Sequence, residues 1–298
     1  MPFTPSHIAA ILPFARSPLA PAALVIGSMV PDLPYFLPLE IPRQLTHSIP
    51  GVPLADLPMG IIVFALWVLV FRAPIVDFAP EWVRARFRLP KGGIRRPSLR
   101  LVAVIMVSLL VGIATHLVWD AFTHADGWVV LNVATLRAQL GPFTAYRWAQ
   151  YASSIGGLII LGIWATGWVR RTPADESLAS GALPTKLGPR VRVSVWIILV
   201  VVLVGVAMAI WVGRVTAGAG LFNENVLYRT ATVSIGCVGV LAVTACLGWY
   251  VFPRKSVLQK NTPEKNAPGK SVPEEGLPEK GLPQTERSTA TTLPSNSA

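Results

Sequence analysis

Long runs of apolar residues alternate with short polar segments along most of this chain. Five of the runs are long enough to cross a bilayer, which takes about 20 predominantly apolar residues in a helix. A helix of this kind satisfies its backbone hydrogen bonds internally, as the hydrocarbon core requires. The pattern therefore predicts an all-α, multipass transmembrane helical bundle, with spans near residues 55–76, 99–121, 150–169, 193–213 and 230–252.

A sixth apolar region, residues 8–38, does not fit this pattern. Arg16 and six prolines interrupt it, and its longest stretch without charge or proline, from Ala22 to Val30, is too short to cross a bilayer. If the region did span, His7 would be separated from the other histidines by the membrane. We expect instead a broken helical hairpin lying in the outer interface, within an external-face segment of residues 1–54.

Composition and charge agree with a membrane protein. Apolar residues make up 52% of the 298 residues and charged residues only 14%, with a mean hydropathy of +0.54, whereas soluble domains carry about 25% charge. The net charge of +11 does not indicate nucleic-acid binding, because 20 of the 26 Lys and Arg residues fall in alternate inter-span segments. That distribution follows the positive-inside rule. It predicts a cell-membrane protein with membrane lipids as partners, no nucleic acid, and the C-terminus in the cytoplasm; the basic segments are 72–100, 169–192 and the tail from 253.

Two domains follow from this layout. Residues 1–252 form the membrane-embedded helical domain, in which 55–169 hold three spans and 193–252 a C-terminal helical hairpin. Residues 253–298 are rich in Pro, Glu and Lys and have no aromatic residue, so we expect a disordered cytoplasmic tail. Cys237 and Cys246 are nine residues apart in one helix, about 13 Å along its axis, which is too far for a disulfide between them.

The polar residues that carry candidate chemistry lie near the start of the chain. All four histidines fall within the first 124 residues, and His116, Asp120 and His124 are separated by two successive i,i+4 steps. Such residues project from one helical face and can ligate one cation. An aspartate at membrane depth is also costly unless it faces a protein partner. We expect His116 and Asp120 to form the centre of the site and to be its catalytic residues.

The remaining candidates are weaker when each is considered alone. Asp32 lies between two prolines, a pattern that indicates a turn. His47 is expected in an exposed loop, and His7 begins the first apolar run. Asp56 could cap the next span or accept a hydrogen bond at the edge of the site. A hydrogen-bonded His/Asp pair at a helix end would explain Asp120 equally well. Because the topology places all of them on one side of the membrane, the sequence predicts a metal site, best suited to Zn²⁺ with Mn²⁺ or Fe²⁺ also suitable; its expected ligands are His7, Asp32, His47, His116, Asp120 and His124.

Three segments carry a family resemblance. The segment from Met1 to His7, the Gly27–Phe36 segment and the Trp119–Trp128 segment resemble an uncharacterised bacterial multipass membrane family, a domain of unknown function, over about residues 1–170. A more distant similarity is to inner-membrane metal-dependent hydrolases and to the zinc-dependent phospholipase C and single-strand nuclease group. The chain departs from the hydrolase pattern in two places: Leu33-Pro34 replaces a second acidic residue, and Leu45 replaces the basic residue before Thr46-His47-Ser48.

This resemblance implies a metal-dependent hydrolase acting on lipid or envelope phosphoesters at the outer face. The alternative is a non-enzymatic membrane protein, either a metal or ion carrier or a scaffold, in which the His and Asp residues form structural hydrogen bonds. A carrier should have polar groups through the full membrane depth. In the sequence they are concentrated at the expected outer ends of the spans, which favours the hydrolase.

Overall fold

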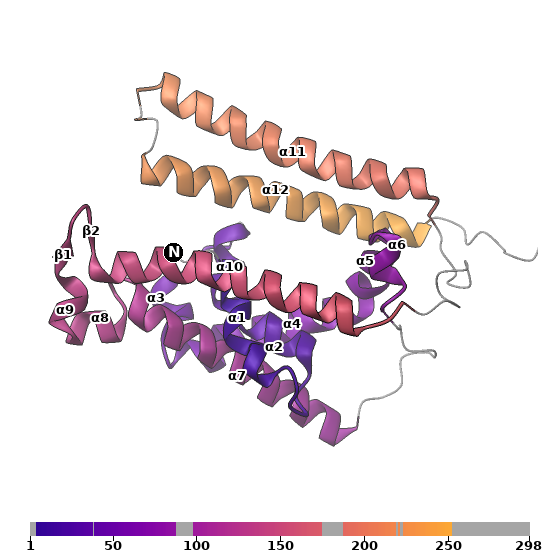
Figure 1. Cartoon of the computed structure of the whole chain (residues 1–298), viewed down its shortest axis with the longest axis horizontal. Helices are drawn as coiled ribbons and strands as arrows, with labels where there is room; N and C mark the ends of the chain where they lie inside the picture. The colour runs from indigo at the N-terminus through magenta and orange to yellow at the C-terminus, as the bar shows by residue number, and fades with distance from the viewer. Residues whose placement is uncertain are drawn as a thin grey trace, which may run out of the picture. The chain divides into compact units, whose positions relative to one another are not determined.

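A computed structural model describes residues 4–37, 39–87, 98–174, 187–218, 220 and 223–251. Helices form almost all of the ordered elements in these ranges, and the only strands among them are a two-residue antiparallel pair (Figure 1). The tail expected from residue 253 lies outside the described residues. The all-α fold is confirmed; the long helices are α4 (Leu57–Leu66), α7 (Leu99–Thr123), α10 (Ala145–Arg171), α11 (Pro189–Thr216) and α12 (Glu224–Val251).

Five helical stretches among the described residues are long and apolar enough to cross a membrane. They are Val52–Phe78, Leu99–Asn132, Ala145–Arg171, Pro189–Thr216 and Asn225–Val251. Each contains the corresponding predicted span, apart from residue 252, which is not described. The first stretch begins with the π-helical turn η4 (Val52–Asp56) and continues through α4, a second π-helical turn η5 (Trp67–Phe71) and α5 (Arg72–Phe78).

Shorter elements precede and connect the spans. The N-terminal region contains the 3₁₀ turns η1, η2 and η3, with the short helices α1 to α3 between and after them. A two-stranded hairpin and two short helices lie between α7 and α10. The bounds are η1 (Thr4–His7), α1 (Ile8–Ile11), η2 (Leu12–Phe14), α2 (Pro21–Gly27), η3 (Val30–Phe36), α3 (Arg43–Thr46), α6 (Glu81–Arg84), α8 (Trp128–Asn132), α9 (Ala134–Arg137), β1 (Gln139–Leu140) and β2 (Phe143–Thr144).

The N-terminal region is a re-entrant hairpin that enters the helical bundle. Its turn reaches the middle of α7, where the Ala20 amide donates to Ser108 Oγ at 2.9 Å. Ser108 lies twelve residues before Asp120, about 18 Å along the helix axis. The chain then returns through α2, so His7 and Asp32 lie at the same end of the bundle. The hairpin is therefore broken into short helical pieces, as predicted, but it inserts between helices where we expected it to lie along their ends; that it does not span the membrane stays a prediction.

Close contact between small residues fixes this hairpin against α7. A Cβ on Gly112 would lie 2.4 Å from the carbonyl oxygen of Leu24, and one on Gly27 would lie 2.3 Å from that of Leu109. Leu24 and Leu109 are completely buried beside them. Gly157 of α10 similarly faces the backbone of Ser6 in η1. The N-terminal elements are thus held between α7 and α10 at contact distances that only glycine allows.

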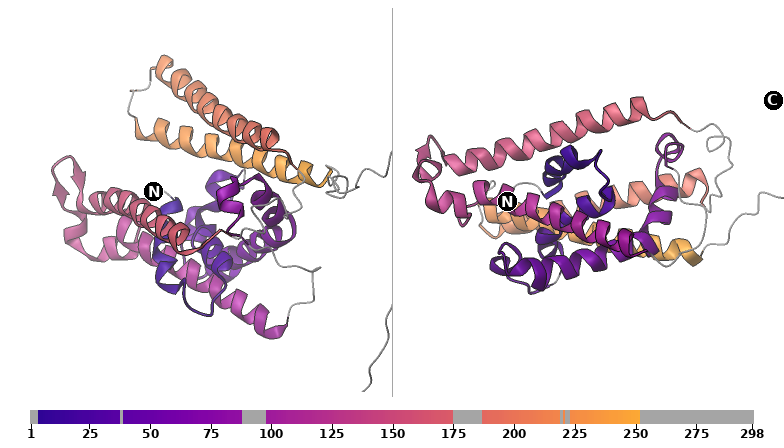
Figure 2. Two further views of the ribbon diagram at one scale, coloured as in Figure 1. Left: turned by 45° about the vertical axis from the view of Figure 1, so that its right-hand side comes forward. Right: turned by 90° about the horizontal axis from the view of Figure 1, so that it is seen from below.

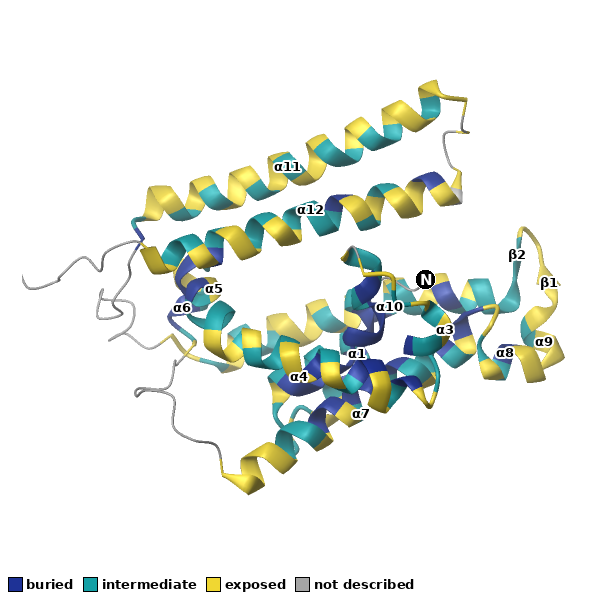
Figure 3. Ribbon diagram, turned by 180° about the vertical axis from the view of Figure 1, so that it is seen from behind, coloured by how far each residue is buried: buried dark blue, intermediate teal, exposed yellow. Residues whose placement is uncertain are grey.

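The two last helices form an antiparallel hairpin (Figure 1 and Figure 2). No residue of α11 is buried, and its surface is apolar, which suits contact with lipid (Figure 3). Asp77 holds α11 and α12 at the end of the bundle that lies far from His7 and Asp32. Its carboxylate is 3.5 Å from Arg84 Nη1 and 3.4 Å from Arg192 Nη2, and it accepts a hydrogen bond from Trp249 Nε1 at 2.7 Å.

Candidate metal centre

A buried polar cluster forms at the C-terminal end of α7. His116 and Asp120 lie one helical turn apart, and both are buried. The distance from His116 Nε2 to Asp120 Oδ2 is 3.6 Å, so the two side chains face one point as their i,i+4 spacing predicts. Asp120 is therefore stabilised by protein groups and not exposed to lipid.

Two residues from distant parts of the sequence complete the cluster. Asp32 lies in η3, and His47 follows the last residue of α3 as its C-cap. His47 Nε2 is 3.4 Å from Asp32 Oδ1, 3.2 Å from Asp120 Oδ2 and 3.3 Å from His116 Nε2. His116 Nε2 is 3.7 Å from Asp32 Oδ1. One ligand atom from each of the four residues thus lies within 4.8 Å of all the others.

These separations suit a tetrahedral cation. Zinc binds imidazole nitrogen and carboxylate oxygen at about 2.0–2.1 Å, so neighbouring ligands of a tetrahedral site are about 3.3 Å apart. The distances that His47 Nε2 and His116 Nε2 make to each other and to the two carboxylates range from 3.2 Å to 3.7 Å, and the two carboxylate oxygens lie within 4.8 Å of each other. The side chains therefore enclose a point from which one metal ion could reach all four ligand atoms after small adjustments.

Hydrogen bonds around the cluster orient its side chains. His116 Nδ1 is 2.9 Å from the carbonyl oxygen of Ser28, so this nitrogen carries the proton and Nε2 presents a lone pair. His47 Nδ1 is 2.9 Å from Thr46 Oγ1, which leaves its Nε2 free in the same way. Thr4 Oγ1 donates to Asp32 Oδ2 at 2.8 Å. Each of these contacts involves the nitrogen or oxygen that points away from the cluster. The second nitrogen or oxygen of the same side chain therefore remains able to bind a cation.

Several atoms that face the cluster have no hydrogen-bond partner among the described residues. They include Asp32 Oδ1, Asp120 Oδ1 and His7 Nε2. Buried polar atoms are normally paired, and each exception needs an explanation. With the two lone pairs of His47 and His116 directed at each other, either a shared proton or a bound cation would satisfy this cluster.

The two remaining predicted ligands lie at its edges. His7 is completely buried; its Nε2 is 3.5 Å from Asp120 Oδ1, and its ring stacks on that of His116 with centroids 4.0 Å apart. His124 Nδ1 is 3.3 Å from Asp120 Oδ2. The helix ends at Thr123 and His124 is extended, so the row does not continue by another helical turn, yet this histidine still reaches Asp120. The structure thus brings all six predicted residues together, with four of them forming the compact ligand set.

The pKa values of two histidines in the cluster are shifted in opposite directions. Burial, aided by the neighbouring His116, lowers the pKa of His7 to about 3, so this imidazole is neutral. Burial also disfavours protonated His47, but the carboxylates of Asp120 and Asp32 outweigh it and raise the pKa of His47. Burial would raise the pKa of Asp32, yet the hydrogen bond with His47 and the nearby positive charge hold it below its usual range. The two carboxylates therefore favour a positive charge at His47, either a proton on its Nε2 or a cation that displaces this proton and binds the lone pair.

Arg43 is a member of the site that the sequence analysis missed. Its guanidinium is 3.4 Å from Asp120 Oδ2 and 3.2 Å from Asp126 Oδ2, and its Nη1 donates to Tyr35 Oη at 3.4 Å. The hydrolase pattern led us to seek a basic residue at position 45. Arg43, one helical turn before Thr46, provides this basic residue instead. It is one of only two Lys or Arg residues in 1–57, and this scarcity could have identified it from the sequence.

Asp56 is buried near the cluster but does not have the expected capping role. Its side chain makes no capping hydrogen bond, and neither carboxylate oxygen has a hydrogen-bond partner among the described residues. It is near enough to His47 and His116 to interact with them electrostatically. The prediction of a cap is therefore wrong, because the helix begins earlier, at the π-helical turn η4.

Comparison with known proteins assigns the chain to a family without a known activity. The model of a domain of unknown function, DUF4184, matches residues 1–252. The chain belongs to this family. The match covers all five spans and the whole cluster, and so extends beyond the segment over which the motifs were recognised.

Similarity to individual proteins is more limited. The chain is 29% identical over 159 residues to the "Glutathione transport system permease protein GsiC" of Salmonella choleraesuis, Salmonella paratyphi A and Salmonella typhi. That alignment covers 51% of this chain and 48% of each permease, so the chain spans about half the length of these relatives. No solved structure matches the chain. These comparisons agree with a membrane protein.

Proposed function

We propose that this DUF4184 protein binds one divalent metal ion through Asp32, His47, His116 and Asp120. The observation that carries the proposal is the convergence of four oriented ligand atoms within 4.8 Å of one another. Their unpartnered, buried atoms and the tetrahedral spacing fit a cation. Two imidazoles and two carboxylates suit Zn²⁺ best, and Mn²⁺ or Fe²⁺ could use the same ligands.

We further propose that the metal serves phosphoester hydrolysis. When bound, a metal of this kind lowers the pKa of a water ligand and polarises a phosphoryl oxygen. The chain's own contribution would come from Arg43, whose guanidinium lies beside Asp120 with 19% of its side chain exposed. A guanidinium in that position can bind phosphoryl oxygens and stabilise negative charge that develops on them. Asp32 and Asp120 would remain ionised ligands, held by Thr4 and by the histidines.

The proposed substrates are lipid or envelope phosphoesters at the outer face of the cell membrane. The cluster lies at the C-terminal end of α7, and a span that starts at the cytoplasmic face would bring this end to the external headgroups. Lys and Arg are scarce in the segments connected at that end, 1–57, 123–149 and 214–229, with two each. This distribution supports an external site and a cytoplasmic C-terminus.

The first test is the metal content of the full-length protein purified in detergent. We expect near-stoichiometric zinc by elemental mass spectrometry in the wild type, and its loss in a His116→Ala/Asp120→Asn double variant. Glu40→Gln, which changes an exposed carboxylate on the same part of the chain, is the matched control and should keep its metal. No metal in a folded wild-type sample after resupply of zinc, manganese and iron would contradict the proposed metal site.

Hydrolysis needs a separate assay. The metal-loaded protein would be incubated with phosphomonoester and phosphodiester lipids, and released phosphate or headgroup would be quantified. We expect turnover that a chelator removes and that the Asp120→Asn variant lacks. Metal binding without turnover on any of these lipids would leave the metal site in place and refute the hydrolase.

A metal carrier is the second candidate, favoured by the partial likeness to a transport permease. A carrier would need ionisable groups along a path through the membrane. Among the described residues, the buried carboxylates that have charged partners instead form two separate clusters, one around Asp120 and one around Asp77. Zinc uptake by proteoliposomes, abolished in the His116→Ala/Asp120→Asn variant, would support the carrier over the hydrolase.

A further inference from the structure

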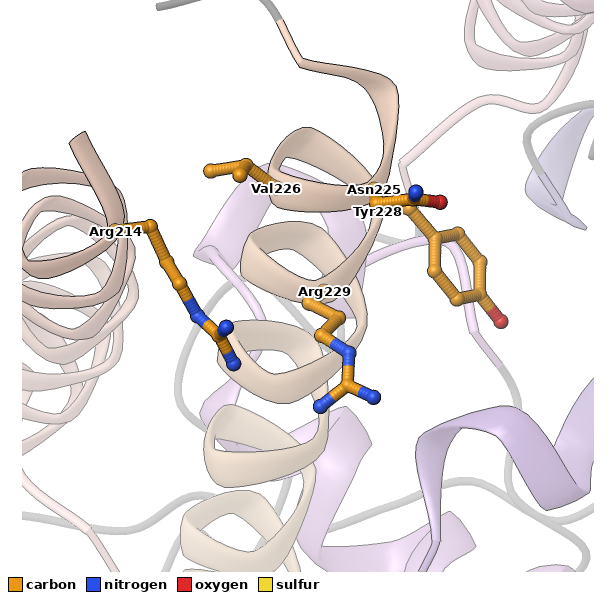
Figure 4. A pocket seen from close by; sticks show the side chains of 5 residues that line it. All are labelled: Arg214, Asn225, Val226, Tyr228 and Arg229. Atoms are coloured by element: carbon orange, nitrogen blue, oxygen red, sulfur yellow. The ribbon is translucent and has the colours of Figure 1, made fainter. Parts of the chain in front are cut away.

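A second polar site lies at the end of the α11–α12 hairpin. Arg214 of α11 and Arg229 of α12 line a cavity of about 540 Å³ together with Asn225, Val226 and Tyr228. Figure 4 shows the two guanidinium groups extending from neighbouring helices along the same side of the hairpin. None of these residues belongs to the metal cluster.

Among the side chains that the structure describes, no carboxylate forms an ion pair with Arg214 or Arg229. Two uncompensated guanidinium groups in one cavity attract an anion, and the planar fork of arginine matches the oxygens of a phosphate. The cavity therefore has the charge of an anion site.

The same arginines also border an apolar cavity. This second space, of about 520 Å³, is lined by Arg214, Arg229 and small or aliphatic residues of both helices. The apolar members are Ala209, Ile210, Gly213, Ala217 and Val233. All of them except Ala217, which follows the last residue of α11, lie further into the two strongly apolar spans, whose mean hydropathies are 3.0 and 2.0. Two arginines that border both a polar and an apolar cavity match the polarity of a phospholipid, which joins a phosphate to acyl chains.

Tyr228 connects this cavity to the metal cluster through a chain of side-chain contacts. Its side chain points away from Arg214 (Figure 4) and packs edge-on against Tyr35, with ring centroids 6.4 Å apart. Tyr35 in turn accepts the hydrogen bond from Arg43. The hairpin cavity thus opens at the same end of the bundle as the cluster, where lipid headgroups are expected.

We propose that the α11–α12 hairpin binds an anionic phospholipid, with the phosphate between Arg214 and Arg229 and an acyl chain along Ala209, Gly213 and Val233. The two guanidinium groups would repel the ammonium or choline group of a zwitterionic headgroup. The site therefore selects lipids that carry net negative charge. This inference does not depend on the metal site or on hydrolysis.

The test is lipid retention by the full-length protein, measured by native mass spectrometry after delipidation and addition of equal phosphatidylglycerol and phosphatidylcholine. We expect about tenfold more bound phosphatidylglycerol in the wild type, and a loss of that preference in Arg214→Gln/Arg229→Gln. Arg214→Lys/Arg229→Lys, which keeps both charges, should retain part of it. The matched control Arg16→Gln/Arg137→Gln removes two exposed arginines from other parts of the chain and should behave as wild type.

Three results would overturn the proposal. Equal retention of both lipids by the wild type would mean that the arginines do not select charge. Undiminished preference in the Arg214→Gln/Arg229→Gln variant would place the lipid elsewhere. Displacement of the lipid by inorganic phosphate at equal concentration would assign the cavity to free phosphate. Zinc measured in the same samples distinguishes failure of this inference from failure of the metal site, because neither arginine contacts the cluster.

Discussion

Gly112→Ala should disrupt the candidate metal centre although this residue contacts none of the ligands. An added Cβ would lie 2.4 Å from the Leu24 carbonyl oxygen and 2.7 Å from the Ser28 amide nitrogen. Ordinary contact begins at 3.4 Å, and both opposing atoms are backbone, so α2 must move by about 1 Å.

The cost can be estimated from packing. Overpacking a closely fitted contact costs about 1–3 kcal/mol, and we take about 3 kcal/mol because no side chain can yield. Alanine recovers about 1 kcal/mol of helix propensity relative to glycine. The net loss is about 2 kcal/mol, equivalent to a Tm lower by about 4–8 °C for a domain of this size.

The same shift reaches the metal ligands. A movement of about 1 Å would break the 2.9 Å contact between the Ser28 carbonyl and His116 Nδ1 and would displace Asp32, which follows four residues later. Loss of such an orienting partner lowers metal affinity about 10–100-fold. We therefore expect Gly112→Ala to lose both thermal stability and zinc.

Thermal unfolding in detergent, followed by tryptophan fluorescence, and zinc affinity by competition with a chelator would measure both effects. Gly156→Ala is the matched control, because a Cβ there meets nothing within 4 Å; it should leave zinc affinity unchanged and stability equal or higher. A Gly112→Ala protein with wild-type Tm and zinc affinity would refute the reasoning that α2 positions the cluster through this contact.

Two further predictions concern other parts of the structure. Thr4→Val, which removes the hydroxyl that donates to Asp32 Oδ2 but keeps the shape, should lower stability by about 1.5–3 kcal/mol and weaken zinc binding about tenfold; unchanged zinc affinity in a chelator competition would show that Thr4 does not orient the ligand. Asp77→Asn should cost about 3–5 kcal/mol, because Arg84 and Arg192 lose their buried counter-ion, yet leave zinc content at the wild-type level; loss of zinc in a folded sample would indicate coupling between the two ends of the bundle.

The sequence by itself determined the elements and one edge of the site. The five spans follow from the length and apolarity of each run, which are local properties, so their positions were predicted to within a few residues. The His116–Asp120 pair was equally accessible, because helical periodicity places residues four apart on one face. The proximity of His124 followed from the same spacing, although the helix ends at Thr123 before reaching it.

The tertiary structure decided which distant residues join that edge. Asp32 and His47 come from turns that look ordinary in sequence, and only the return of α2 along α7 brings them to His116. That path depends on the backbone contact of Gly27 and Gly112, whose closeness no residue pattern expresses. Arg43 was missed for a related reason: its role depends on the three-dimensional positions of Asp120 and Tyr35. Helical periodicity is set by neighbours in sequence, whereas the cluster is set by packing between segments far apart in the chain, such as Ser28 and His116, which are 88 residues apart.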